Sequence, residues 1–361
     1  MARNSDMPSS VIAFAWLLVG LTAPCSGADL LAHDPTFFTL IDKNAVLQTI
    51  AHSDVSFAHE APVWIPATNE LFFVSNRLQA SNQSVSDPSQ PQHIQMSKLN
   101  LGTKAVTAFH SNPDILMANG AIRISEDEIV VCSQGLGAVG GSLIQLNIRT
   151  LTSKKLVDTY NYLPFNSPND VVYSSHYHGY FFTDPNYGFA QGFRNPSVLP
   201  PSVYFFNPTT GLVKALITTG IAKPNGLVLS LDSKVLYVTD SGFFTGATTD
   251  PGVPRVIYQY EVSINGQDGS PDVKNGKVFA EVAVGIADGI KLDVLGNVWT
   301  GEGDGVSVYS PAGKRLGQIL LPGGAANLAF VNPRSLVMLA ETNIFLINLL
   351  VDGSYPPLPP I

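Results

Sequence analysis

The sequence predicts an all-β protein, a six-bladed β-propeller, from three observations. Charged residues make up only 13% of the 361 residues and hydrophobic residues make up 45%, so many apolar segments must be buried. Long helices exposed to solvent would need more charged residues than this chain has. The 31 glycines and 26 prolines indicate frequent turns between short strands. One short unit recurs six times at intervals near the roughly 40–50 residues of a four-stranded blade, and a ring of such blades forms one domain.

Short apolar runs support the all-β prediction. They are rich in β-branched and aromatic residues, follow one another at intervals of about ten residues, and are bounded by Gly, Pro, Asn and Asp. No long segment shows the apolar period of a helix. The clearest runs are Leu71–Val74, Ile129–Val131, Tyr180–Phe182, Val203–Phe206, Val235–Val238, Val256–Tyr260 and Ile344–Ile347.

The recurring unit begins with a polar residue, usually Asn or Asp, which is followed by a small residue, an apolar stretch, a turn and a second strand. Asn225-Gly226-Leu227-Val228 is typical, and the copy at His59-Glu60 is the most divergent. The innermost strand of each propeller blade lines the central channel, so equivalent residues of six blades should converge. We call these first residues the axial anchors; they are Glu60, Asn119, Asn169, Asn225, Asp288 and Asn327.

The axial anchors have the chemistry of a hard-metal site. All six side chains bear oxygen, and the carboxylates of Glu60 and Asp288 offset the charge of a divalent ion. Ca²⁺ takes six to eight oxygen ligands in proteins. A single Asn or Asp at a strand start is more simply a turn residue, but six aligned polar residues favour a Ca²⁺-type site on the axis.

The N-terminus has the layout of a secretory signal peptide. An apolar run from Val11 to Leu21 follows Arg3 and precedes small residues that end at Ala28. The run is too short to cross a hydrocarbon core of about 30 Å, which argues against the alternative of a membrane anchor. We therefore expect a signal peptide over residues 1–28, a single propeller domain over 29–361, and a secreted protein with an N-glycosylation sequon at Asn82.

Charge and motifs exclude several functions. A net charge of −8 argues against nucleic acid and, after signal removal, anionic membranes as partners. The sequence contains neither G-x-S-x-G nor H-E-x-x-H. Gly135–Gly140 matches G-x-G-x-x-G, but the strand-like alternation of Ser142–Ile148 follows it where a dinucleotide site needs a helix, so we expect a glycine-rich hairpin or a channel loop.

Two further groups are candidates for the chemistry of the site. His59 precedes Glu60 and could orient a ligand or transfer protons. Asp240, in Thr239-Asp240-Ser241, follows a strong strand and could face the channel mouth or cap a turn; Asp184 has a similar setting.

These residues resemble the senescence-marker-protein and gluconolactonase family. The likeness is carried by His-Glu60-Ala-Pro-Val-Trp, Asn169-Asp170, Pro-Asn225-Gly-Leu, Thr-Asp240-Ser and Ala-Asp288-Gly-Ile, and Phe182–Gly188 is similar to bacterial and fungal gluconolactonases. It extends from about Ser56 to Leu349. The resemblance implies a six-bladed propeller that hydrolyses lactones or related esters with one divalent metal, usually Ca²⁺. It also implies Glu60, Asn169, Asn225 and Asp288 as metal ligands, and Asp288 as the proton-transfer group.

One departure from the family bears on the substrate. Members that act on sugar lactones often carry Arg two residues before the position of Asn169, where this chain has Ser167. A basic contact to a polyhydroxylated substrate is thus absent at that position, which leaves room for a less polar lactone. We expect Asn119, Ser167 and His59 to contact a small-molecule lactone or ester, with loops 79–92, 189–201 and 243–254 at the pocket rim.

The expected mechanism combines the metal with a carboxylate base. The metal would polarise the lactone carbonyl, and Asp288 would activate water; Asp240 is the reserve base, because a carboxylate bound to the ion is less basic. Two alternatives stay open at this point. One is a propeller that only binds a partner, and the other is a strictosidine-synthase-like propeller of secondary metabolism.

Overall fold

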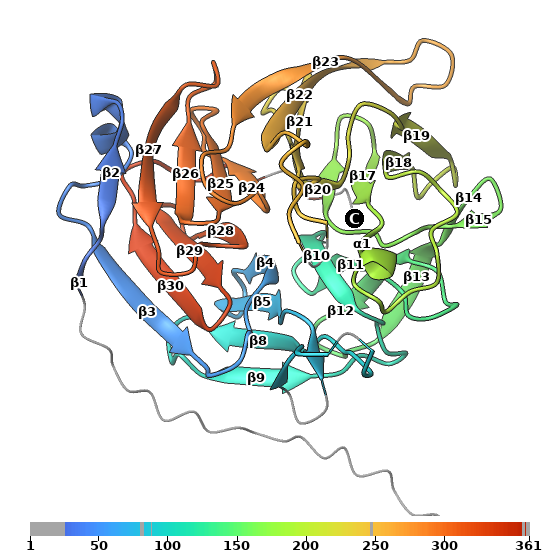
Figure 1. The fold of residues 1–361 in the computed structure, drawn as a ribbon, viewed down its shortest axis with the longest axis horizontal. Helices are drawn as coiled ribbons and strands as arrows, with labels where there is room; N and C mark the ends of the chain where they lie inside the picture. The colour runs from blue at the N-terminus through green and yellow to red at the C-terminus, as the bar shows by residue number, and fades with distance from the viewer. Residues whose placement is uncertain (1–25, 80–82, 88, 246–247, 356–357, 359–361) are drawn as a thin grey trace, which may run out of the picture.

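The computed structural model describes residues 26–79, 83–87, 89–245, 248–355 and 358. Six antiparallel sheets surround a central axis, so the predicted six-bladed β-propeller is confirmed (Figure 1). Most of the predicted signal peptide, residues 1–25, and the sequon at Asn82 lie outside the described residues. No helix among the described residues is long and apolar enough to cross a membrane.

The first four blades each pair four strands in chain order. A short hairpin, β6 (Leu78–Gln79) and β7 (Gln83–Ser84), interrupts the first blade, and β14 (Thr159–Tyr160) pairs with β15 (Leu163–Pro164) after the second. The blades are β4 (Glu60–Ile65), β5 (Glu70–Val74), β8 (Met96–Asn100) and β9 (Val106–Phe109); β10 (Ala118–Arg123), β11 (Glu128–Ser133), β12 (Ser142–Asn147) and β13 (Ser153–Val157); β16 (Val171–Ser174), β17 (Gly179–Asp184), β18 (Ser202–Phe206) and β19 (Val213–Ile217); and β20 (Pro224–Leu229), β21 (Val235–Asp240), β22 (Val256–Ile264) and β23 (Pro271–Glu281).

The N-terminal segment closes the ring. The sixth blade takes its inner three strands from the end of the chain and its outer strands, β3 (Val46–His52) and β1 (Ser26–Gly27), from the beginning. The fifth blade gains β2 (Leu30–Ala32) as its outermost strand, and a 3-10 helix (Pro35–Thr39) lies between β2 and β3. The remaining strands are β24 (Ile290–Leu292), β25 (Val298–Glu302), β26 (Gly305–Tyr309), β27 (Arg315–Leu320), β28 (Asn327–Val331), β29 (Ser335–Ala340) and β30 (Asn343–Asn348).

The cores lie between neighbouring blades, which explains the continuous apolar runs of the sequence. Successive strand residues point to opposite faces of a sheet. In β17, Phe182 packs with Val130 and Cys132 of the second blade, whereas Phe181 packs with Leu236 of the fourth blade. Both faces of such a strand are buried, so it shows no polar alternation. Cys132, in the same strand as Val130, is a fully buried free cysteine.

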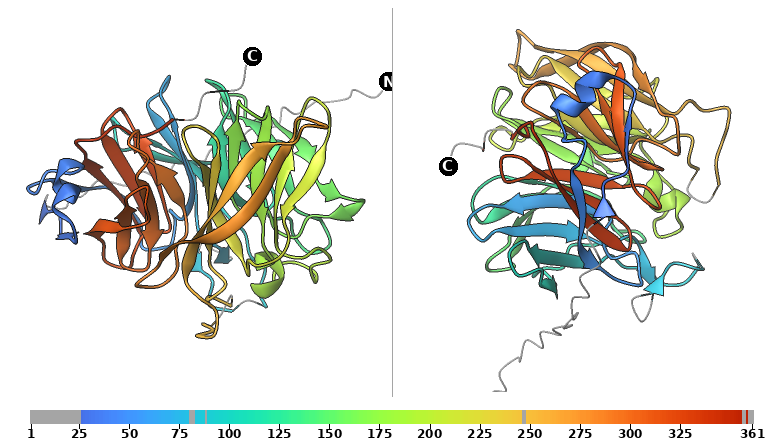
Figure 2. Two further views of the ribbon diagram at one scale, coloured as in Figure 1. Left: turned by 90° about the horizontal axis from the view of Figure 1, so that it is seen from above. Right: turned by 90° about the vertical axis from the view of Figure 1, so that its left-hand side faces the viewer.

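Each axial anchor lies at the start of the innermost strand of its blade or within two residues of that start. One short helix, α1 (Tyr187–Ala190), follows β17 and lies at one face of the disc when the propeller is seen from the side (Figure 2). The segment Gly135–Gly140 forms the predicted hairpin, in which Leu136 and Val139 exchange backbone hydrogen bonds.

Candidate active site

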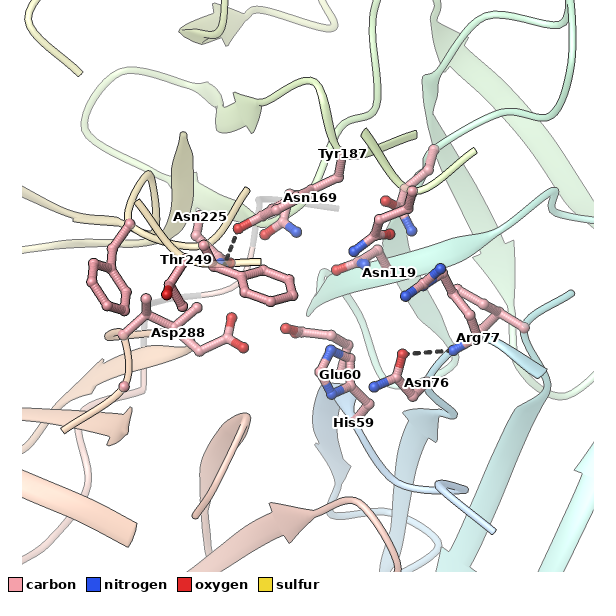
Figure 3. A pocket seen from close by; sticks show the side chains of 17 residues that line it. His59, Glu60, Asn76, Arg77, Asn119, Asn169, Tyr187, Asn225, Thr249 and Asp288 are labelled. Atoms are coloured by element: carbon pink, nitrogen blue, oxygen red, sulfur yellow. Dashed lines mark hydrogen bonds between the residues drawn. The ribbon is translucent and has the colours of Figure 1, made fainter. Parts of the chain in front are cut away.

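A cavity of about 320 Å³ opens where the innermost strands begin. Five of the six axial anchors line it; Asn327 does not (Figure 3). The other lining residues come from loops and from α1, and they are His59, Asn76, Arg77, Ile94, Gln134, Tyr187, Gln191, Phe243, Phe244, Thr249, Gly285 and Ile286. Of the three predicted rim loops, 189–201 and 243–254 supply lining residues.

Two threonines tie neighbouring anchors together. Thr183 Oγ1 accepts a hydrogen bond from the amide that follows Asn169 and donates one to the carbonyl oxygen of Asn225, at 2.7 Å. Thr239 Oγ1 repeats the pattern one blade further on: it accepts from the amide that follows Asn225 and donates to the carbonyl oxygen of Asp288, at 2.9 Å. The backbone positions of Asn169, Asn225 and Asp288 are thereby fixed relative to one another.

Glycine follows several anchors because the next blade approaches closely. A Cβ on Gly226 would lie 2.4 Å from the carbonyl oxygen of Asp288, and a Cβ on Gly289 would lie 2.2 Å from Cγ of Asn327. The small residue of the recurring unit therefore allows the anchors to converge on the axis.

Glu60, which is buried, and Asp288, which is half-buried, turn their carboxylates toward each other in the cavity, with oxygen atoms within 4.8 Å (Figure 3). Burial, followed by the charge of Asp288, raises the pKa of Glu60 well above its usual range. Burial also raises the pKa of Asp288, and the positive charge of His59 is the main opposing influence. Asn327 Nδ2 donates to Glu60 Oε2 at 2.6 Å, so the sixth anchor holds a carboxylate instead of lining the cavity.

The donor atoms fit a hard divalent cation. Oδ1 of Asp288 and Oδ1 of Asn169 are buried and have no hydrogen-bond partner among the described residues. Asn225 Nδ2 lies 3.4 Å from the hydroxyl groups of both Tyr187 and Ser241, which leaves its amide oxygen as the atom available to a cation. Unpartnered buried oxygens and two close carboxylates carry a large desolvation cost that a bound cation would offset.

His59 lies beside this oxygen cluster. Its Nδ1 donates to Glu341 Oε1 at 2.6 Å, and Glu341 also accepts hydrogen bonds from Asn76. Burial opposes the charge, but Glu341 and then Glu60 outweigh it and raise the pKa of His59 to about 10. One nitrogen of His59 lies within 4.8 Å of carboxylate oxygens of Glu60 and Asp288. In the metal-free site the raised pKa favours the protonated imidazole, which acts as a hydrogen-bond donor and as a counter-charge to the carboxylates.

Asp240 does not line the cavity, so its predicted role as reserve base has no geometric support. Its carboxylate accepts hydrogen bonds from the amides of Ala222, Lys223 and Gly242 at 2.8–2.9 Å. It thus fixes the turn that leads into Asn225. The structure realises the turn-capping alternative for this residue.

Ser167 is also buried away from the cavity. Its Oγ accepts a hydrogen bond from the amide of Gly188 in the first turn of α1, at 2.9 Å. Ser167 therefore positions the helix that carries Tyr187 instead of contacting substrate directly, which differs from the predicted role. Asn119 and His59, the other two predicted substrate contacts, do line the cavity.

Sequence reasoning missed Arg77, the guanidinium that lines the cavity. It lies in the segment between β5 and β6, in the first blade. The available signal was a single arginine shortly after the end of β5, the strand that pairs with β4. One arginine in such a place has little specificity.

Comparison with known proteins agrees with the geometry. The family model described as "SMP-30/Gluconolactonase/LRE-like region" matches residues 58–340. A lactonohydrolase of Aspergillus oryzae is 28% identical over 311 residues, which cover 79% of this chain and 67% of the relative. A gluconolactonase of Zymomonas mobilis is 26% identical over 291 residues, which cover 79% of this chain and 75% of the relative.

A solved structure described as a putative gluconolactonase superposes with a TM-score of 0.70 and 25% identity, covering 90% of this chain and 99% of that one. The family match runs from two residues before Glu60 to Ala340, and it includes every axial anchor. The chain belongs to the SMP-30/gluconolactonase/LRE-like family.

Proposed function

We propose that this protein is a divalent-metal-dependent hydrolase that opens lactones. The supporting observation is the convergence of Glu60, Asp288 and the unpartnered oxygen of Asn169 on one cavity of about 320 Å³. Two relatives that cover most of the chain are named for lactone hydrolysis, one as a lactonohydrolase and one as a gluconolactonase. A propeller that only bound a partner would have no need for buried axial carboxylates.

Glu60, Asn169, Asn225 and Asp288 would hold the metal, and their all-oxygen donor set suits Ca²⁺. When bound, the metal would act as a Lewis acid on the lactone carbonyl and stabilise the negative charge that develops on its oxygen. The raised pKa values of Glu60 and Asp288 describe the metal-free site, where burial disfavours both ionised carboxylates and the charge of Asp288 adds to this effect on Glu60.

Asp288 is the proposed general base. Its carboxylate accepts a proton from water while the water oxygen attacks the carbonyl carbon. The bond between that carbon and the ring oxygen then breaks, and the proton passes to the ring oxygen, which leaves as a hydroxyl group. The products are a carboxylate and an alcohol in one open chain. His59, protonated beside Asp288, stabilises the ionised form of the base.

The cavity lining offers both apolar and hydrogen-bonding groups that would orient a substrate. Phe243, Phe244 and Ile286 supply apolar surface, whereas Asn119, Gln134 and Gln191 supply hydrogen-bonding groups. A lactone ring with one polar substituted face and one carbon face matches this division.

The test is pH-stat hydrolysis of a panel of γ- and δ-lactones, from sugar lactones to alkyl lactones, with and without a calcium chelator. We expect acid release on at least one lactone, its loss with chelator and its recovery with added Ca²⁺. Glu60→Gln should lower the rate on the order of 10²-fold or more, while the exposed control Glu126→Gln should retain it. Activity that survives both chelation and Glu60→Gln, or a panel in which nothing opens, would overturn the proposal.

The N-terminal apolar run supports a proposal of secretion. Cleavage after Ala28 would remove β1, which pairs with Val46 and Leu47 at the outer edge of the sixth blade, and would leave β3 in place. Expression of the full chain in a eukaryotic secretory host should yield medium protein beginning at Asp29. Its mass should fall on glycosidase treatment if Asn82 is modified. Retention of the intact chain inside the cell would contradict the proposal.

A further inference from the structure

We propose that the lactone carries a carboxylate substituent, which Arg77 binds at the side of the cavity opposite Asp288. This inference rests on the proposed lactonase function and names its substrate class. It also revises the expectation drawn from Ser167, because a cation is present in the pocket but comes from a different blade.

Arg77 is a guanidinium with unused donors. One terminal nitrogen donates to Gln92 Oε1 at 3.1 Å. The Nε atom is buried and has no hydrogen-bond partner among the described residues. Arginine has five N–H donors, four of them on the terminal nitrogens, and among the described residues only one terminal nitrogen of Arg77 is engaged, so the terminal nitrogens retain donors for a ligand.

No acidic side chain among the described residues lies in direct contact with the guanidinium of Arg77. It forms no ion pair within the part of the chain that the structure describes. Glu341 attracts it from a distance, but burial has the larger effect and lowers the pKa of Arg77. The carboxylate of Glu341 is already hydrogen-bonded to His59 and Asn76. A partly buried cation without an acidic partner is costly, and an anionic ligand would remove that cost.

Gln92 fixes the position of Arg77 through a bridge to a second segment of the cavity lining. Gln92 accepts from Arg77 and also donates through Nε2 to the carbonyl oxygen of Gln191, at 3.2 Å. This bridge joins the first blade to the segment after α1, both of which line the cavity. Pre-organised donors lose less conformational entropy when they bind a ligand.

Arg77 is placed to bind a part of the substrate that is remote from the ester bond. In Figure 3, Asp288 and Arg77 lie on opposite sides of the cavity, with Glu60 and His59 between them. The reacting carbonyl belongs near Asp288 and Glu60, so Arg77 meets a substituent on the ring. Asn119, Gln134 and Gln191 already supply hydrogen-bonding groups for hydroxyl substituents. A guanidinium is suited to a carboxylate, which it can bind through two parallel hydrogen bonds.

The experiment compares two lactones of the same shape, 5-oxotetrahydrofuran-2-carboxylate and its neutral carboxamide, by pH-stat at fixed ionic strength. The measured quantity is the ratio of their kcat/KM values. For the wild-type enzyme we expect the carboxylate to be favoured by about tenfold or more, the range of a charge-assisted hydrogen bond. Arg77→Gln should bring the ratio close to one, and Arg77→Lys should give an intermediate value because lysine supplies charge without the planar fork.

Lys154→Gln is the matched control, because it removes one exposed positive charge from an outer strand. It should leave the ratio at the wild-type value. Equal kcat/KM values of the wild-type enzyme for both lactones, or an unchanged ratio in Arg77→Gln, would overturn the inference. The wild-type ratio decides the matter even if Arg77→Gln fails to fold. Failure of the enzyme to open either of these lactones or any lactone of the wider panel would instead overturn the proposed function.

Discussion

Asp184 and Asp240 are equivalent residues of consecutive blades, and each carboxylate binds the two amides that lie 18 and 17 residues before it. Asp184 accepts from Asn166 and Ser167, and Asp240 accepts from Ala222 and Lys223. In both blades these amides belong to the turn that leads into an axial anchor. The two aspartates are therefore positioning residues for Asn169 and Asn225.

Asp240→Asn should impair positioning without removing a base. The amide keeps one acceptor oxygen, so at least one of the three buried N–H groups loses its partner, at a cost of about 1–3 kcal/mol in the free energy of unfolding. We expect a lower kcat/KM with a pH–rate profile of unchanged shape. Urea unfolding and the pH profile measure the two effects, and disappearance of the acidic limb of the profile, which reports deprotonation of the base, would show that Asp240 is the base after all.

Asp184 should make the protein less stable as pH rises toward neutrality. Burial raises its pKa to about 7 in the folded state, against about 3.9 in an unfolded chain. Between these values the unfolded state releases a proton that the native state retains, so the free energy of unfolding falls from about pH 4 to about pH 7. Asp184→Asn should flatten this slope in urea titrations across that range. An unchanged slope would mean that Asp184 is ionised in the native protein.

The sequence predicted the blades well because their strands are buried on both faces and their anchors repeat. Strand β3 was not predicted, because most of its residues are only partly buried and its sequence therefore lacks a continuous apolar run. Its pairing with β30, almost 300 residues away, depends on closure of the whole ring. Local sequence contains little information about such a contact.

The site was predictable to the extent that it repeats. The anchors could be aligned with one another, so their convergence followed from the fold. Arg77 and Ser167 could not be placed this way, because each is set by one loop and its neighbours. Arg77 is held by a hydrogen bond to Gln92, and the hydroxyl oxygen of Ser167 accepts a hydrogen bond from the amide of Gly188 in α1. Asp240 shows the same limit: a carboxylate at a strand end can face the channel or bind nearby amides, and the turn geometry decides.

Metal removal should reveal the repulsion between Glu60 and Asp288. Without metal the charge of Asp288 adds to burial in raising the proton affinity of Glu60, so Asp288→Asn should leave the metal-free protein at least as stable as the wild type at pH 8. Saturating Ca²⁺ at about 100 times its Kd should stabilise the wild type by about 2.7 kcal/mol and the variant much less. Thermal unfolding with chelator and with Ca²⁺ gives both comparisons. Equal stabilisation of the two proteins by Ca²⁺ would place the ion elsewhere.

Gly226→Ala should disturb the metal ligands through backbone packing alone. The new Cβ would lie 2.4 Å from the carbonyl oxygen of Asp288, which cannot easily retreat because Thr239 Oγ1 donates to it. Overpacking of this kind costs about 1–3 kcal/mol, and displacement of Asp288 should weaken Ca²⁺ binding as well. Gly266→Ala is the matched control, since a Cβ there meets nothing within 4 Å. Isothermal titration with Ca²⁺ and urea unfolding of both variants test the effect, and equal Ca²⁺ affinity in the two variants would show that the close approach of the fourth and fifth blades does not position Asp288.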